Sequence, residues 1–116
     1  MRQTFRKRDR IVRDVDFAEI IRHGGVAANG VLVAFVRRRE AGAPVRMGVT
    51  IPKKTGNAVV RNRWKRWIRE AFRDCRGDLE PGYDIVLRPK KGAQGSWSAI
   101  RRGMPKLIKR AIAKTV

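Results

Sequence analysis

Apolar positions along the chain repeat with two different periods, and they predict the order helix, strand, strand, helix, strand, helix. The first helix lies in the stretch DVDFAEIIRHGG, where Asp14 is a suitable N-cap and Gly24 a suitable stop. Its apolar face comprises Phe17, Ala18, Ile20 and Ile21. Two β-branched stretches, residues 31–39 and 45–54, then predict two strands that pair with each other. Pro52 lacks a ladder donor, so it should lie near the end of the second strand or on a sheet edge.

The second half of the chain predicts two longer helices with one strand between them. Asn57 is the expected N-cap of the first of these helices, and the segment YDIVLRP has the composition of a strand. Ser96 is placed to cap the final helix, which reaches toward Lys114. Pro105 falls inside that last pattern and should kink or interrupt the helix near residues 103–104, because proline lacks a backbone donor and crowds the preceding turn.

These elements predict an α/β fold of the α+β sandwich kind, in which a small, mostly antiparallel sheet packs with three helices. Residues 1–116 suffice for one domain and hold no internal repeat or low-complexity tract. Residues 1–13, MRQTFRKRDRIVR, are basic with scattered apolar groups, and we expect them to form a mobile or extended arm.

The most informative stretch is VVRNRWKRWIREAFRDC, residues 59–75, in which two tryptophans stand among arginines and lysines. At about 100° per residue, the apolar side chains of this helix fall within an arc of roughly 140°. They are Val60, Trp64, Trp67, Ile68, Ala71, Phe72 and Cys75. Trp64 and Trp67 are therefore predicted to belong to the core and to pack on the sheet. The alternative is that both indole rings are stacking platforms for nucleic-acid bases.

The opposite face of the same helix is cationic. Its polar side chains are Asn62, Lys65, Arg66, Arg69 and Arg73, while Arg61 and Arg63 flank the apolar arc. An ordinary solvent-exposed face mixes charges of opposite sign at i,i+4 spacing, whereas here like charges or polar groups follow one another. This pattern favours nucleic-acid phosphates as the ligand, because arginine binds them through paired hydrogen bonds and Asn62 adds a directional one.

The composition also indicates a polyanionic partner. The chain carries 29 lysines and arginines against 10 acidic residues, a formal net charge of +19. Nucleic acid is the partner that this charge predicts, and a membrane surface is the competing one. No apolar run approaches the roughly 20 residues that span a bilayer, and no signal-peptide apolar stretch follows the basic N-terminus. We therefore expect a cytoplasmic protein.

Candidate catalytic groups are scarce. The acidic residues are dispersed, and the single histidine (His23) and single cysteine (Cys75) exclude a His–His metal site, an internal disulfide and a thiolate zinc cluster. We expect both residues to be structural. A protein that cleaves RNA by itself needs clustered carboxylates for metal ions or a histidine acid–base pair. Any RNA cleavage would therefore depend on the chemistry of a partner.

The stretch GNAVVRNRWKRWIREAFR, from Gly56 to Arg73, resembles the signature of the bacterial ribonuclease P protein family. That signature is a glycine–asparagine turn followed by Arg-Asn-Arg, Lys-Arg, Arg-Glu and Phe-Arg in helical register. The resemblance extends to the basic arm, to Asp16 and Phe17, to the late aromatic Phe35, to PKK before the turn and to GYDIVLRP after it. It implies the small subunit of a ribonucleoprotein endonuclease that removes 5′ leaders from precursor tRNA. The RNA subunit would be the catalyst, supported by Mg²⁺, with no metal bound to the protein.

The resemblance also implies roles for individual residues. The catalytic RNA would be bound by Arg61, Asn62, Arg63, Lys65, Arg66, Arg69 and Arg73. The single-stranded leader would enter a cleft between the first helix and the sheet, formed by Phe17, Ile21 and Phe35 with Lys53 and Lys54 at its edge. The family often has an aromatic residue where this chain has Ile21, so base stacking there would be weaker.

The fold implied by the resemblance has a left-handed β–α–β crossover at the Arg-Asn-Arg helix, against the general right-handed rule. The protein would be monomeric without RNA. Two other classes of protein stay open. A small basic ribosomal protein would explain the charge and the arm but not the register of the signature. A DNA-binding regulator would need side chains that read base edges, and this helix offers mostly phosphate-binding groups.

Overall fold

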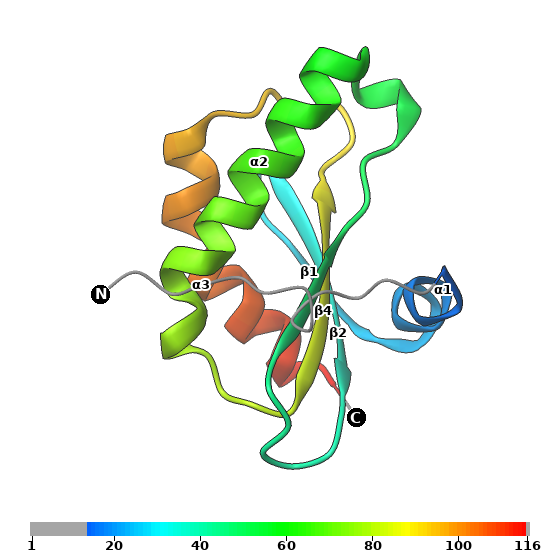
Figure 1. The fold of residues 1–116 in the computed structure, drawn as a ribbon, viewed down its shortest axis with the longest axis vertical. Helices are drawn as coiled ribbons and strands as arrows, with labels where there is room; N and C mark the ends of the chain where they lie inside the picture. The colour runs from blue at the N-terminus through cyan, green and yellow to red at the C-terminus, as the bar shows by residue number, and fades with distance from the viewer. Residues whose placement is uncertain (1–13, 116) are drawn as a thin grey trace.

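The fold, a computed structural model that describes residues 14–115, is a four-stranded sheet with helices on both faces (Figure 1). The helices are α1 (Asp14–His23), α2 (Ala58–Cys75) and α3 (Trp97–Ala113). The strands are β1 (Gly25–Ala28), β2 (Leu32–Arg38), β3 (Arg46–Val49) and β4 (Tyr83–Pro89). Short 3-10 helices, η2 (Lys53–Thr55) and η3 (Arg76–Asp78), flank α2. The arm expected at residues 1–13 lies outside the described residues.

The strand order in the sheet is β1-β2-β4-β3, with β3 parallel to β4 and the other neighbours antiparallel. The predicted mostly antiparallel sheet is confirmed. The predicted pairing of the strands at 31–39 and 45–54 is wrong, because β4 lies between β2 and β3. Six of the seven residues of β4 are buried, which is the pattern of a strand covered on both faces and suits it to the centre of the sheet. The hydrophobic period predicts that a strand exists but not which strand is its neighbour.

The structure adds one strand, β1, that the hydrophobic pattern did not predict. Its first residue, Gly25, lies so close to α3 that a Cβ atom there would stand 2.6 Å from the carbonyl oxygen of Ala111. The turn into β2 is closed by Asn29, whose Oδ1 accepts hydrogen bonds from the backbone N–H groups of Val31 and Leu32 at 2.9 and 2.8 Å. The Asn-Gly pair at this turn was a hairpin signal in the sequence.

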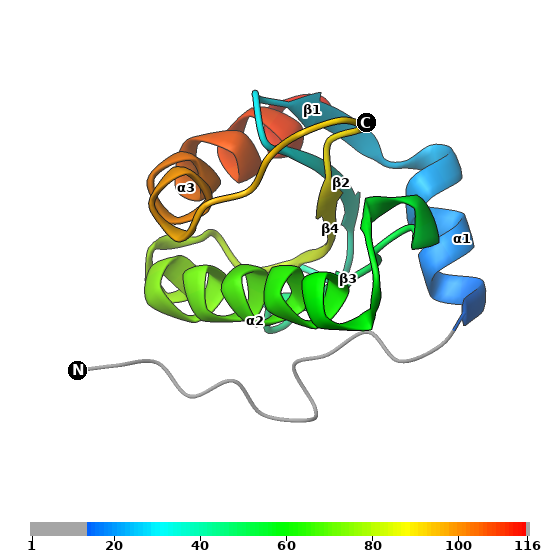
Figure 2. The same cartoon turned by 90° about the horizontal axis from the view of Figure 1, so that it is seen from above.

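The helices divide between the two faces of the sheet (Figure 2). Because side chains alternate along a strand, Ala34 and Val36 of β2 join the main core, which also contains buried residues of α2 and α3. Phe35 points the other way and joins a second cluster with Ile20 of α1 and Val86 of β4. The sheet therefore presents a fully covered face and a second face covered by one short helix.

Both predicted helix caps of the second half are confirmed. Asn57 Oδ1 accepts a hydrogen bond from the Val60 N–H at 3.0 Å, and Ser96 Oγ accepts one from the Ala99 N–H at 3.1 Å. Pro105 does not interrupt α3, which is continuous from Trp97 to Ala113. The two parts of α3 nevertheless run in different directions in Figures 1 and 2, as expected for a proline kink.

The parallel strands β3 and β4 are joined through α2, so this helix is the β–α–β crossover that the resemblance implies. Its handedness stays a prediction. Within residues 14–115, no helix has the length and apolar character required to cross a membrane.

Candidate nucleic-acid interface

The apolar side of α2 is anchored by its two tryptophans. Trp64 is only 4% exposed, and a Cβ atom on Gly95 would stand 2.5 Å from its indole ring. Trp67 is half-buried and meets Trp64 edge to face, with ring centroids 6.3 Å apart at an interplanar angle of 68°. The guanidinium of Arg63 lies 5.9 Å from the Trp67 ring centroid, within range of a cation–π interaction. The prediction that both tryptophans belong to the core is confirmed, and bases have no access to the Trp64 ring.

The other side of α2 carries five of the seven residues that were singled out for RNA binding, and Arg61 and Arg63 lie at the borders of the apolar side. We call this set, Arg61, Asn62, Arg63, Lys65, Arg66, Arg69 and Arg73, the α2 cationic face. Asn62, Arg63 and Arg66 are exposed, and the other four are half-buried. Their positions cover about 18 Å of helix axis at about 1.5 Å per residue. Although Glu70 lies among them, six cations over this length can contact several phosphates at once.

Two arginines of the α2 cationic face have incomplete hydrogen bonding. The Nε–H groups of Arg61 and Arg73 are buried and have no hydrogen-bond partner among residues 14–115. An unpaired buried donor is unfavourable, so both side chains would gain stability by turning toward an incoming acceptor. Phosphate oxygens are acceptors of this kind.

A second surface lies where α1 crosses the sheet. Phe17 and Ile21 are half-buried and pack against the cluster that contains Phe35, so the structure brings the three predicted apolar residues together. Phe35 itself is only 5% exposed, and the Arg88 guanidinium lies 4.9 Å from its ring centroid. Arg88 therefore covers Phe35, and a base can stack on this ring only if Arg88 moves.

A basic hollow of about 630 Å³ adjoins this surface. It is lined by Val33 of β2, Lys54 of η2, Arg88 of β4, and Lys90 and Lys91 of the following loop. Val33 also packs against the cluster of Phe35, so the hollow continues the surface beside α1.

Of the two predicted lysines, one lines the basic hollow and the other does not. Lys54 lines the hollow, while Lys53 is exposed on the same 3-10 helix. Arg88, Lys90 and Lys91 were not among the residues predicted from the sequence. Side-chain alternation along YDIVLRP could have found Arg88, since it stands two positions after Val86 and so shares its face of the sheet.

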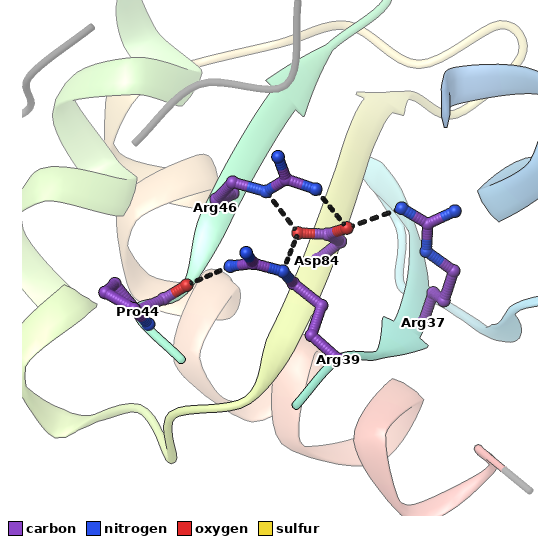
Figure 3. Close-up of polar contacts among 5 residues, drawn as sticks. All are labelled: Arg37, Arg39, Pro44, Arg46 and Asp84. Carbon is purple, nitrogen blue, oxygen red and sulfur yellow. Dashed lines mark hydrogen bonds and ion pairs between the residues drawn. The ribbon is translucent and has the colours of Figure 1, made fainter. Parts of the chain in front are cut away.

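Asp84 is the centre of an ion-pair cluster at the other end of this sheet face (Figure 3). Its carboxylate is fully buried and accepts two hydrogen bonds from Arg46, both at 2.8 Å, and one from Arg37 at 2.7 Å. Arg39 lies 3.4 Å from the same carboxylate. Burial opposes ionisation of Asp84, but the hydrogen bonds and charges of these arginines prevail and lower its pKa. The cluster links the ends of β2, β3 and β4.

The possible metal ligands of residues 14–115 are scattered, and the single thiol is buried. Across the part of the chain that the structure describes, no three His, Cys, Asp or Glu side chains are grouped so that they could hold a metal ion. Cys75 is buried in the core, and burial raises its pKa to about 11. His23 is exposed at the end of α1.

Comparison with known sequences gives consistent matches over most of the chain. Residues 5–112 match the family described as Ribonuclease P. The ribonuclease P protein component of Brevibacillus brevis is 36% identical over 103 residues, which are 88% of this chain and 82% of that protein. The corresponding protein of Shouchella clausii is 33% identical over 107 residues, which are 91% of this chain and 88% of that protein.

Solved structures agree with the sequence matches. The Staphylococcus aureus RNase P protein has a TM-score of 0.78 at 30% identity, covering 92% of this chain and 96% of that one. The Thermotoga maritima RNase P protein has a TM-score of 0.77 at 31% identity, covering 87% of this chain and 96% of that one. With the signature helix, its core-facing tryptophans and its cationic outer face in place, these matches show that the chain belongs to the bacterial ribonuclease P protein family.

Proposed function

We propose that this protein is the RNA-binding subunit of a ribonuclease P ribonucleoprotein, which removes the 5′ leader from precursor tRNA. The observation that carries the proposal is the division of α2 into a core side with Trp64 and a predominantly cationic side. Seven phosphate-binding groups on one helix suit the backbone of a folded RNA better than base edges. Phosphates are negatively charged hydrogen-bond acceptors at regular spacing, and base edges are not. The α2 cationic face is therefore assigned to the catalytic RNA.

The surface beside α1 is assigned to the single-stranded leader. Along it, apolar side chains from Phe17, Ile21 and Phe35 give way to the basic hollow at Lys54 and Arg88. A single strand presents bases on one side and phosphates on the other, and this sequence of apolar and cationic groups matches both. In this assignment Arg88 leaves the Phe35 ring to pair with a phosphate, and a base takes its place on the ring.

The protein supplies binding and charge neutralisation, and the RNA subunit supplies the catalytic groups. Mg²⁺ ions held by the RNA would support the hydrolysis. Bringing a precursor tRNA against a large RNA places many phosphates close together, and a subunit of charge +19 offsets their repulsion. We expect the protein to lower the Mg²⁺ concentration that the RNA requires. We place this activity in the cytoplasm, with a monomeric protein joining the RNA.

The test is cleavage of precursor tRNA by the cognate ribonuclease P RNA at low Mg²⁺, with and without the protein. Added protein should increase the cleavage rate, and more for a long leader than for a very short one. The double variant Lys54→Gln with Arg88→Gln should lose the advantage of the long leader. The matched variant Arg22→Gln with Lys109→Gln, which removes the same charge from exposed positions on α1 and α3, should keep it. Absence of any stimulation would favour the ribosomal-protein alternative.

A further inference from the structure

A third basic surface lies on α3, apart from the α2 cationic face and from the basic hollow beside α1. It is a groove of about 580 Å³ between α3 and the β1–β2 turn. Arg102, Lys106 and Arg110 line its helix side, and Asn29 and Gly30 line its turn side. We call it the α3 groove. In Figure 2, α2 runs along one side of the molecule, and α3 with β1 occupies the other.

The positive charge of the α3 groove is not neutralised within the groove. Arg102, Lys106 and Arg110 are exposed and follow one another at four-residue spacing, about 6 Å apart along the helix axis. The groups to which the two arginines donate are uncharged: Arg102 donates to Ser98 Oγ at 2.8 Å, and Arg110 donates to the Ala28 carbonyl oxygen at 3.3 Å. Residues 85–116 contain no aspartate or glutamate at all. Like charges at this spacing are unfavourable in the isolated protein, so an anionic ligand would stabilise them.

The walls of the α3 groove are held in place by close packing. A Cβ atom on Gly103 would stand 2.7 Å from Asn29 Nδ2, so the absence of a side chain at position 103 leaves room for the Asn29 amide against the helix. Asn29 is itself fixed by the two backbone hydrogen bonds that its Oδ1 accepts. Gly30 has open space around it, which leaves its backbone accessible. The groove is thus a preformed channel with three cations on one wall and neutral amide groups on the other.

From this arrangement we propose that the α3 groove binds the sugar–phosphate backbone of a second segment of the catalytic RNA. Evenly spaced cations suit successive phosphates, and the amides of Asn29 and Gln94 suit ribose hydroxyls and phosphate oxygens. The contact is independent of base sequence, because the groove offers mostly backbone-binding groups. This inference rests on the proposed function, since it takes the RNA bound at α2 as the ligand. It adds a second point of attachment on the far side of the protein.

The first test is the salt dependence of binding to the cognate catalytic RNA, without precursor tRNA. The variant Arg102→Gln, Lys106→Gln and Arg110→Gln should bind at least tenfold more weakly, and its plot of log K against log salt should be flatter by about 2–3. The control Arg22→Gln, Lys109→Gln and Lys114→Gln loses the same charge from exposed positions outside the groove and should stay close to the unchanged protein. Glutamine preserves helix propensity, and circular dichroism checks the fold. Equal losses in both variants would overturn the inference.

The second test locates the contact by directed hydroxyl-radical cleavage. Cys75 is buried, so an iron chelate can be attached selectively to an introduced cysteine. Ala99→Cys places the chelate in the α3 groove, and Ala58→Cys places it at the start of α2. The two probes should cut separate segments of the catalytic RNA. The inference would be overturned if only the probe at position 58 cut the catalytic RNA. It would also be overturned if the probe at position 99 cut added precursor tRNA and not the catalytic RNA. Either result would leave the proposed function intact. No cuts from either position would overturn both.

Discussion

Trp64 lies against Gly95, where a single added methyl group would meet the indole ring. This contact sets the rotation of α2 about its own axis, because the ring fits between the helix and the loop that follows β4. Once Trp64 points inward, the helical period points Lys65, Arg66 and Arg69 away from the sheet. A core side chain therefore determines where the cationic groups stand, although it touches no RNA in the proposed complex.

Replacing Trp64 by alanine should lower the free energy of unfolding by about 3–5 kcal/mol, because a large side chain is removed from a packed core. Urea denaturation measures this change. Val59→Ala, on the same helix but 66% exposed, is the control and should change stability little. If Trp64→Ala were instead nearly neutral for stability and abolished RNA binding, the ring would be a base-stacking platform.

Asp84 should make folding stability sensitive to acid. Its pKa is lowered in the folded protein by the arginines around it, despite the opposing effect of burial. The stabilisation is therefore fully present above the ordinary pKa of 3.8 and is lost as the pH falls through the lower folded-state value. Thermal unfolding followed from about pH 6 down to pH 2 should show this loss as a falling melting temperature.

The variant Asp84→Asn isolates this contribution. It should be destabilised by about 3–5 kcal/mol at neutral pH, toward the lower end because the arginines are partly exposed and can turn to water. It should also lack part of the acid dependence of the unchanged protein. Asp78→Asn, at an exposed position, serves as the control. Identical acid profiles for Asp84→Asn and the unchanged protein would show that other carboxylates control the transition.

At the scale of elements, the two faces of α2 have different roles. The apolar side contributes to folding stability, and the α2 cationic face is the one proposed to bind RNA. The double variant Arg66→Ala with Arg69→Ala should weaken binding to the catalytic RNA and flatten its salt dependence by about 1–2, while the folded structure is retained. Filter binding at several salt concentrations measures the first effect, and circular dichroism the second. Arg22→Ala with Lys109→Ala provides equal charge loss elsewhere. Unfolding of the Arg66 and Arg69 variant would mean that these side chains stabilise the core.

The helices were predictable because their signals are local. The caps at Asn57 and Ser96 act over three residues, and the apolar arc of α2 repeats every turn. The strands were harder, since pairing depends on residues far apart in the chain. β1 has only four residues, and its position depends on the approach of Gly25 to α3, which no local pattern reports.

The same distinction applies to the candidate site. The α2 cationic face could be read from the sequence in full, because one helix carries all of it. The basic hollow could be anticipated only at Lys54, since Arg88, Lys90 and Lys91 reach it through the pairing of β4 with β2. The α3 groove was not anticipated, because it requires both the missed strand β1 and the continuity of α3 through Pro105.

At the scale of the whole molecule, positive charge is spread over several sides, while some of the few carboxylates are paired with arginines of the protein itself. Asp84, one of the ten acidic residues, is buried among arginines, and Asp74 is paired with Arg101 at 3.5 Å. The outer surfaces of α2, the loop after β4 and α3 therefore keep most of their charge for a partner. A protein with positive charge on several sides can contact several RNA segments that surround it. Contact with a single RNA helix would leave much of this charge without a phosphate partner.

The order of the strands has a consequence for synthesis on the ribosome. β4 is central in the sheet, yet it is the last strand to be translated, after β1, β2, β3 and the whole of α2. Until residue 89 has emerged, β3 lacks the strand it pairs with, and one edge of β2 stays open to other chains. The sheet of the nascent protein can therefore close only after β4 has emerged, and a chain truncated ahead of β4 would be prone to aggregate.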